Sequence, residues 1–236
     1  MPSISSCKNI AAFAAAALVV IALPASSFAH APQSSPRRAA KSAKAAPSTR
    51  FIVLLDPGHG GADSGTPLPS NMTEKSAALA FALHLRDALV ARGLEVRMTR
   101  DSDAYLSPDQ RGEISASLQP SACLNLHLTG TGSGIHIFTA LPAPPEANGF
   151  TPYSQVQAQY LHQSRLFAST IEANLKNSAV PVSLSPASLP ALERMHCPAV
   201  AIELSPATAA AAASINALTQ GILTWRAQWT RMMATQ

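Results

Sequence analysis

From residue 51 onward, short apolar runs alternate with amphipathic stretches that are long enough to form helices. The first run, 51–55, ends at Asp56-Pro57-Gly58, which is typical of a buried strand closed by a turn. Further strands are predicted at 94–99, 122–126, 135–141, 189–192 and 199–204, and helices at 73–92, 107–118, 154–176 and 205–233. The proline-rich segment 142–153 is predicted to be a loop. This order predicts a single α/β domain with a mostly parallel mixed sheet and helices on both faces.

Three of the predicted strands carry ionisable residues at or just beyond their carboxyl ends. The first leads into His59, the third ends at His127, and the last contains Glu203. Ligands of open α/β sheets bind beyond the carboxyl ends of the strands. A carboxylate within an apolar strand is costly to bury without a partner. One such residue could form a structural ion pair, but ionisable residues at three strand ends point to a functional site.

Each candidate residue also has a simpler interpretation when taken alone. His59, between glycines, could be an exposed loop histidine, and Glu74 could merely stabilise a helix start by about 0.3–1 kcal/mol. His127 is ambiguous by itself. Taken together, two histidines and one glutamate form the His₂Glu set of catalytic zinc sites, which leave a fourth position for water. Glu203 would then be the general base. The spacing alone is too wide to be diagnostic.

The first 50 residues differ from the rest of the chain in composition. Residues 1–29 are predicted to be a signal peptide, because Lys8 precedes the uncharged apolar run 10–23 and small residues follow at 27–29. A membrane anchor is the alternative, but the run is shorter than the roughly 20 residues that a span needs. Residues 30–50 are predicted to be a flexible basic linker. We therefore expect export to the periplasm or the cell wall, with no stable membrane span after cleavage.

The positive net charge of the chain, +4, comes entirely from this N-terminal part, which has no acidic residue. Six of the 17 basic residues lie before residue 51, which leaves 11 against 13 acidic residues in the predicted domain. No nucleic-acid partner is expected, because such domains carry a basic surface. Export would permit a disulfide between Cys123 and Cys197. The sequence leaves open whether these two cysteines pair or remain buried free thiols.

The segment Leu54–Gly61, with the sequence Leu-Leu-Asp-Pro-Gly-His-Gly-Gly, resembles the opening motif of the zinc-dependent N-acetylmuramoyl-L-alanine amidases. The similarity continues in order through the rest of 51–236, at Glu74-Lys75, Thr99-Arg100-Asp101, Arg111, His127 and Pro198–Glu203. The resemblance implies that His59, Glu74 and His127 bind one Zn²⁺ ion and that Glu203 is the catalytic glutamate. It also implies the substrate, peptidoglycan, and the bond cleaved, which joins the lactyl group of N-acetylmuramic acid to L-alanine of the stem peptide.

Two segments depart from the family's usual pattern. The segment 125–129 reads Asn-Leu-His-Leu-Thr where Ser-Ile-His-Ala-Asn is usual, and 204–208 reads Leu-Ser-Pro-Ala-Thr where Gly-Phe-Leu-Ser-Asn is usual. Loss of a polar neighbour of the third ligand could cost 10–100-fold in metal affinity or activity. Because all four site residues remain, we expect an active enzyme. The short segment 142–153 predicts that no inhibitory helix blocks the site, and the need for an activator protein stays open.

Two other functions remain to be weighed. A non-catalytic peptidoglycan-binding homologue would be favoured by an altered ligand or base, and none is altered. A zinc peptidase of different specificity would use the same chemistry, and only the resemblance favours the amidase. The other histidines of the predicted domain, at 84, 136, 162 and 196, are assigned no role. Arg100 and Arg111 could contact substrate carboxylates, but the simpler expectation is that they pair with Asp101 or Asp103.

Overall fold

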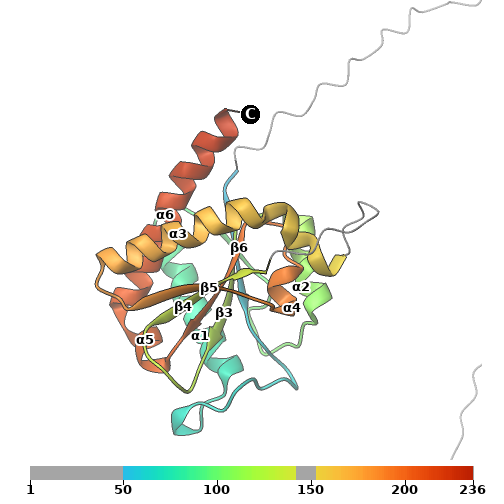
Figure 1. Cartoon of the computed structure of the whole chain (residues 1–236). Helices are drawn as coiled ribbons and strands as arrows, with labels where there is room; N and C mark the ends of the chain where they lie inside the picture. The colour runs from blue at the N-terminus through green and yellow to red at the C-terminus, as the bar shows by residue number, and fades with distance from the viewer. Residues whose placement is uncertain (1–49, 142–152, 236) are drawn as a thin grey trace, which may run out of the picture. The chain divides into compact units, whose positions relative to one another are not determined.

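A six-stranded mixed sheet forms the centre of the computed structural model, which describes residues 50–141 and 153–235 (Figure 1). The strand order is β2-β1-β3-β6-β4-β5. The strands are β1 (Ile52–Pro57), β2 (Glu95–Met98), β3 (Ala122–Leu128), β4 (Ile135–Ala140), β5 (Val182–Ala187) and β6 (Ala199–Leu204). All neighbouring pairs are parallel except β4 and β6, which are antiparallel. The predicted mostly parallel mixed sheet is therefore confirmed.

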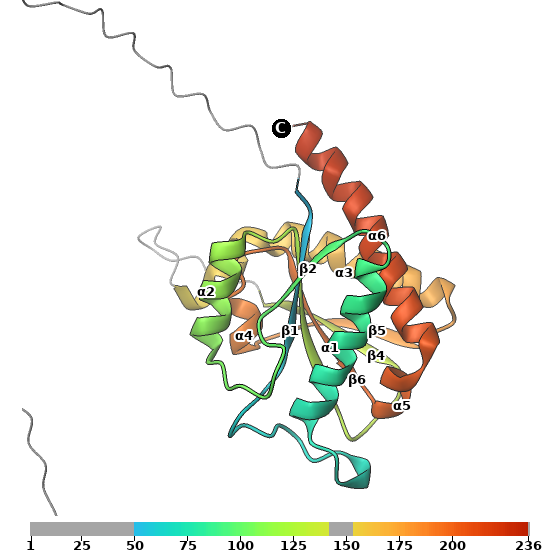
Figure 2. The same cartoon turned by 180° about the vertical axis from the view of Figure 1, so that it is seen from behind.

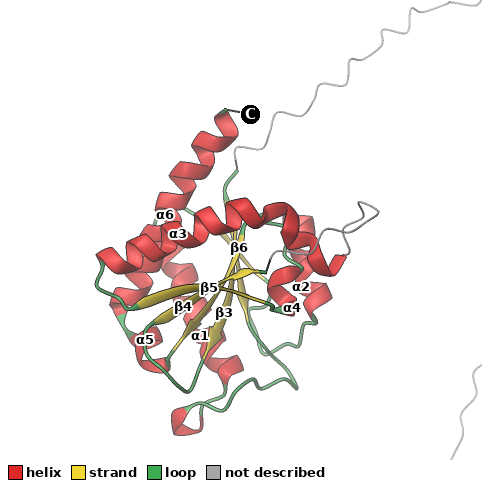
Figure 3. Ribbon diagram, in the orientation of Figure 1, coloured by secondary structure: helices red, strands yellow, loops and turns green. Residues whose placement is uncertain are grey.

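Helices cover both faces of this sheet, as predicted (Figure 3). The α-helices are α1 (Glu74–Val90), α2 (Pro108–Leu118), α3 (Leu161–Asn177), α4 (Pro190–Glu193), α5 (Pro206–Ala210) and α6 (Ala212–Ala234). Two 3₁₀ segments, η1 (Pro69–Asn71) and η2 (Tyr153–Tyr160), precede α1 and α3. Helices α1 and α6 lie on one side of the sheet and α2 and α4 on the other (Figure 2).

The two faces of the sheet are buried to different extents. One face, with residues such as Leu55, Leu124 and Ile202, forms the main core against α1, α3 and α6. The other face forms a smaller core against α2 and α4, at Leu54, Cys123, Ala140, Ala199 and Ala201. On that second face, residues nearer the carboxyl ends of β3 and β6 are only half-buried. The uncovered half of the second face is therefore where a site can form.

Serine caps mark two helix starts that the sequence predicts. Ser107 accepts a hydrogen bond from the Gln110 N–H, and the Gln110 side chain accepts one from the Ser107 N–H, so α2 begins with a capping box. Ser205 caps α5 in a similar way. The predicted continuous helix 205–233 is wrong, because Ala211 is extended and separates α5 from α6. The break lets α6 bury its own apolar stripe, including Leu218, Ile222 and Trp225, in the main core.

The region 154–193 differs most from the prediction. The predicted strand at 189–192 is wrong, because Pro190 opens the short helix α4. Proline cannot donate to a strand ladder but suits the first turn of a helix. The edge strand is β5, at 182–187, instead. The predicted helix 154–176 becomes regular only at Leu161, after η2.

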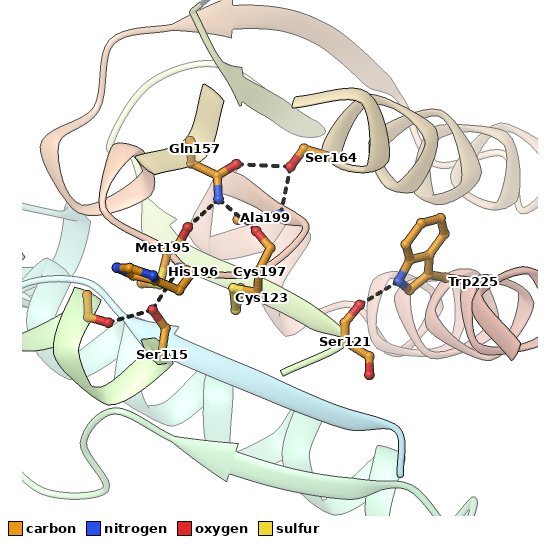
Figure 4. Close-up of a disulfide and its surroundings, with 11 residues drawn as sticks. Ser115, Ser121, Cys123, Gln157, Ser164, Met195, His196, Cys197, Ala199 and Trp225 are labelled. Atoms are coloured by element: carbon orange, nitrogen blue, oxygen red, sulfur yellow. Dashed lines mark hydrogen bonds between the residues drawn. A yellow bond between two sulfur atoms is a disulfide. The ribbon is translucent and has the colours of Figure 1, made fainter. Parts of the chain in front are cut away.

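Cys123 and Cys197 form a disulfide in the smaller core, with a Cα–Cα distance of 6.2 Å (Figure 4). Of the two alternatives, the structure therefore contains the disulfide and not two buried free thiols. Gln157 lies beside the bridge and donates to the carbonyls of Met195 (2.6 Å) and Cys197 (2.7 Å). Ser164 donates to the Gln157 side-chain oxygen and accepts from the Ala199 N–H. These bonds tie η2 and α3 to the chain that enters β6.

The predicted signal peptide, 1–29, and nearly all of the predicted linker, 30–50, lie outside the described residues. The same holds for most of the predicted loop 142–153. Within the described residues, no helix is long and apolar enough to cross a membrane.

Candidate metal centre

Three of the predicted site residues meet where β1, β3 and α1 come together. His59 follows β1, Glu74 is the first residue of α1, and His127 is the next-to-last residue of β3. His59 Nε2 lies 3.0 Å from Glu74 Oε1, and His127 Nδ1 lies 2.8 Å from the same oxygen. One ligand atom from each residue lies within 4.8 Å of the other two. The tertiary structure thus brings together the three residues that the sequence predicts as metal ligands.

Two glycines make room for this cluster. A Cβ atom on Gly58 would lie 2.4 Å from His127 Cε1. A Cβ on Gly65 would lie 2.7 Å from both Glu74 Oε2 and His59 Cδ2, and Gly65 also has a positive φ of 68°. Any larger residue at either position would have to displace a ligand side chain. These two glycines therefore allow close packing around the cluster.

In both His59 and Glu74, the side-chain polar atom that faces away from the cluster has its own hydrogen-bond partner. His59 Nδ1 lies 2.9 Å from Asp63 Oδ2, which leaves Nε2 to face the cluster. Glu74 Oε2 accepts a hydrogen bond from the Thr66 N–H at 2.8 Å, which leaves Oε1 at the centre. Partners of this kind orient metal ligands in proteins.

Asn125 is the corresponding hydrogen-bond partner of His127. Its Oδ1 lies 3.1 Å from His127 Nε2, and its Nδ2 donates to Asp56 Oδ2 at 2.7 Å. The altered segment 125–129 therefore retains a polar neighbour for His127, in place of the loss that its departure from the family's pattern suggested. Because the asparagine faces Nε2, His127 presents Nδ1 to the cluster.

Two buried arginines brace the turn that carries His59, and their predicted pairing with Asp101 or Asp103 is wrong. Arg111 forms an ion pair with Asp56 and donates to the carbonyls of Pro57 (2.9 Å) and His59 (2.8 Å). Arg100 donates to four backbone carbonyls, those of Pro57, Gly58, Lys75 and Ser102. Burial, and then the neighbouring Arg111, lower the pKa of Arg100 from its ordinary value. The sequence signal that could have found this brace is Asp56, a carboxylate that ends an apolar run and is costly to bury without a partner.

The electrostatics favour an anionic Glu74. Burial opposes its ionisation, but hydrogen bonds from His127, from His59 and from the Thr66 N–H outweigh burial and hold the pKa of Glu74 well below its usual range. The hydrogen bond to Glu74 is the main cause that raises the pKa of His59. Two imidazole nitrogens and one carboxylate oxygen are the donor set of catalytic zinc sites. The converging donors and the glycine cradle fit a zinc ion held by His59, Glu74 and His127.

Glu203 lies beside this cluster. It is the register partner of His127 between β3 and β6, so the two side chains share a face on adjacent strands about 4.8 Å apart. Glu203 and the three candidate ligands line one cavity of about 300 Å³, with Phe138, Ala187 and Leu189 among its apolar walls. Within the described residues, the Glu203 carboxylate has no hydrogen-bond or ion-pair partner. The predicted base therefore faces the cavity that contains the predicted ligands.

The remaining histidines lie elsewhere, with one exception. His84 and His162 are exposed on α1 and α3. His196 lies beside the disulfide, where its backbone N–H donates to Ser115 and where burial lowers the pKa of its ring (Figure 4). The exception is His136, which β4 places next to Glu203.

Together, the sheet, the His₂Glu cluster at its strand ends and the facing glutamate define a class, that of α/β proteins with a candidate metal-dependent hydrolytic site. The family model described as N-acetylmuramoyl-L-alanine amidase matches residues 53–215. The chain belongs to this family, as its sequence motifs indicate.

Curated relatives and solved structures agree with this assignment. The chain is 28% identical over 115 residues to amidase AmiC of Neisseria meningitidis, a match that covers 46% of this chain and 28% of AmiC. It is 34% identical over 79 residues to AmiA of Escherichia coli, which covers 34% of this chain and 27% of AmiA. The chain thus matches less than a third of either relative. The fold matches amidase Ami1 of Mycobacterium smegmatis, with a TM-score of 0.61, 24% identity, and coverage of 75% of this chain and 97% of Ami1.

Proposed function

We propose that this protein is a zinc-dependent N-acetylmuramoyl-L-alanine amidase. It hydrolyses the amide bond between the lactyl group of N-acetylmuramic acid and L-alanine of the peptidoglycan stem peptide. One observation carries this proposal: the ligand atoms of His59, Glu74 and His127 converge within 4.8 Å, and Glu203 lines the same cavity. The family assignment supplies the substrate.

Each of the four residues has a defined task in this reaction. His59, Glu74 and His127 hold the zinc ion, which when bound supplies Lewis-acid chemistry that polarises a carbonyl group and makes water easier to deprotonate. Glu203 takes a proton from the attacking water and passes it to the nitrogen of the leaving group. A C–O bond forms at the lactyl carbonyl and the C–N bond breaks. The products are a lactyl carboxylate and a stem peptide with a free L-alanine amine.

The proposed location is outside the inner membrane, in the periplasm or the cell wall. The predicted signal peptide over 1–29 and the basic linker over 30–50 support export of a catalytic domain at 51–236. The disulfide between Cys123 and Cys197 is compatible with an oxidising compartment. Peptidoglycan lies in that compartment as well.

The test is a digestion of peptidoglycan sacculi by the purified protein, with and without a chelator. Mass spectrometry of the soluble products should find stem peptides with a free L-alanine amine. The release should stop on chelation and return with added zinc. The matched control is the variant Glu203→Gln, which keeps all three ligands and should release no peptide.

Two outcomes would contradict the proposal. Folded, zinc-loaded protein that binds sacculi but releases nothing would indicate a non-catalytic peptidoglycan-binding homologue. Cleavage of bonds within the stem peptide, instead of the bond to the lactyl group, would indicate a zinc peptidase.

A further inference from the structure

A row of polar side chains crosses the uncovered half of the second sheet face. Glu203 in β6 is the register partner of His127 in β3 and of His136 in β4. His136 is in turn the partner of Ser183 in the edge strand β5. Side chains of directly paired residues lie on the same face, with Cβ atoms about 5 Å apart. His127, Glu203, His136 and Ser183 therefore stand side by side across four strands.

This row is accessible, and it adjoins the cavity of the candidate metal centre. His127, Glu203 and His136 are half-buried and Ser183 is exposed, since α2 and α4 cover the other half of this face. Phe138 lies two residues after His136, so both side chains point to the same face of β4. Phe138 and Glu203 both line the cavity. His136 is not itself among the residues that line the cavity, but it is the direct strand neighbour of Glu203, which is.

One nitrogen of the His136 ring is anchored and the other is available. Nδ1 lies 2.7 Å from the Ser183 hydroxyl oxygen. Nε2 has no hydrogen-bond partner among the described residues. When the serine hydroxyl donates to Nδ1, Nε2 carries the proton and becomes a donor. A fixed ring with one free donor beside a cavity can bind a substrate group.

The order of the residues in this row suggests which part of the substrate His136 binds. The row runs from a metal ligand, His127, to the base, Glu203, and then to His136. Glu203 must reach both the attacking water on the His127 side and the leaving nitrogen. A substrate that binds with its leaving group on the far side of Glu203 from the candidate ligands would place the chain beyond that nitrogen against His136. This chain is the stem peptide, which begins with L-alanine.

The spacing between strands limits the contact of His136 to the first residues of the stem peptide. Adjacent strands lie about 4.8 Å apart and an extended residue spans about 3.3 Å, so His136 faces the first or second residue after the scissile bond. The second residue is a glutamate that is linked through its γ-carboxyl group and carries a free α-carboxylate or the corresponding amide. A carboxylate is the stronger acceptor for an imidazole N–H.

We propose that His136 is a specificity-determining residue that binds the α-carboxylate of the second stem residue through Nε2, with Ser183 holding its ring. This inference rests on the proposed amidase function and extends it. It predicts a preference for stem peptides whose second residue is glutamate over those in which it is isoglutamine.

The test compares two soluble substrates, N-acetylmuramoyl-L-alanyl-D-glutamate and N-acetylmuramoyl-L-alanyl-D-isoglutamine. For the glutamate substrate, His136→Ala should raise KM about 10- to 100-fold, as expected for loss of a hydrogen bond to a charged group. The kcat should change less than about twofold, and the preference for glutamate should disappear. His136→Gln, which keeps an N–H donor, should retain part of the preference. Ser183→Ala should shift KM in the same direction but less.

A binding measurement separates recognition from catalysis. The glutamate substrate is titrated calorimetrically into Glu203→Gln and into the double variant Glu203→Gln/His136→Ala. The double variant should bind this substrate more weakly than Glu203→Gln, by the same factor as the rise in KM. His84→Ala is the matched control, because His84 is an exposed histidine on α1. This control should leave KM and affinity unchanged. Thermal unfolding of each variant checks that it folds.

The outcomes separate this inference from the function on which it rests. Wild-type protein that cleaves both substrates, with unchanged KM and preference in His136→Ala, would overturn the role of His136 and leave the amidase intact. A fall in kcat at constant KM would also overturn it, because the histidine would then act in the chemistry and not in recognition. Folded, zinc-loaded wild type that cleaves neither substrate would overturn the proposed function itself.

Discussion

The two sides of the cavity differ in how firmly their polar side chains are held. On the ligand side, formed by His59, Glu74 and His127, hydrogen bonds fix the second polar atom of each residue. On the base side, formed by Glu203 and His136, the Glu203 carboxylate has no polar partner among the described residues, and only one nitrogen of His136 is anchored.

This difference matches what the proposed function requires of the two sides. Holding a metal ion requires donor atoms in a fixed geometry before the ion arrives, and polar neighbours supply that geometry. A base that moves a proton from water to a leaving nitrogen must reach two atoms in turn, and a tight hydrogen bond would hinder this. Substitutions on the ligand side should therefore affect folding and metal binding, whereas substitutions on the base side should affect turnover and substrate binding.

The largest expected effect is on the base side. Glu203→Gln should lower kcat by about 10²–10⁴-fold, the usual contribution of a general base. Zinc affinity and the unfolding midpoint should stay at the wild-type values, because Glu203 has no structural partner among the described residues. Kinetics with N-acetylmuramoyl-L-alanyl-D-glutamate measure kcat, and competition with a chelator measures zinc affinity. Glu172→Gln on α3 is the matched control. Weaker zinc binding by Glu203→Gln would contradict the assignment of metal binding to the ligand side alone.

The next effect is on the ligand side and concerns stability. Arg111→Met leaves Asp56 buried without its ion pair, so the free energy of unfolding should fall by about 3–5 kcal/mol. Denaturant titration measures the loss. The double variant Arg111→Met/Asp56→Asn should be less destabilised than the single variant, because no buried charge is left unpaired. Equal loss in both variants would show that packing, and not charge, makes Arg111 important.

The disulfide should affect both sides together, because it connects β3, which carries His127, to the chain entering β6, which carries Glu203. The bridge joins residues 74 positions apart and so restricts the conformations of the unfolded chain. Removal of a native disulfide costs about 2–5 kcal/mol. Cys123→Ala/Cys197→Ala should lose stability in this range, while zinc affinity at low temperature stays unchanged. Calorimetric unfolding and zinc titration check this. A large loss of zinc affinity in the folded variant would mean that the bridge also sets the ligand geometry.

The smallest effect is that of Asn125. Asn125→Leu removes the acceptor at His127 Nε2, and zinc affinity should fall about 10–100-fold, as is typical when the partner of a metal ligand is lost. Asn125→Ser, which introduces the residue usual in the family, should lose less. Competition with a chromogenic chelator measures both affinities. Wild-type affinity in Asn125→Leu would show that the ligand side does not depend on this partner.

Much of the local structure could be predicted from single segments of the sequence. The apolar runs that form β1, β3, β4 and β6 were recognisable because buried strands are short, apolar and bounded by turn residues. The start of α2 was recognisable because Ser107-Pro108 is a local helix signal. The errors arose where local signals are weak. The polar strand β5 has no continuous apolar run, and nothing within the alanine-rich segment marks the break at Ala211.

The sequence alone indicated the four candidate site residues, three of them at or near strand ends and Glu74 at a helix start. Residue type, local position and the resemblance to the amidase family were sufficient for this, because all three can be read without knowing which segments pack together. The tertiary structure alone decided their partners. Asn125 meets His127 and Asp56, Arg111 reaches a carboxylate 55 positions away, Cys123 meets Cys197, and His136 lies beside Glu203. Strand order and register create these contacts, and both follow from packing the whole chain around one core. No local pattern records them, because each joins segments that come together only after folding.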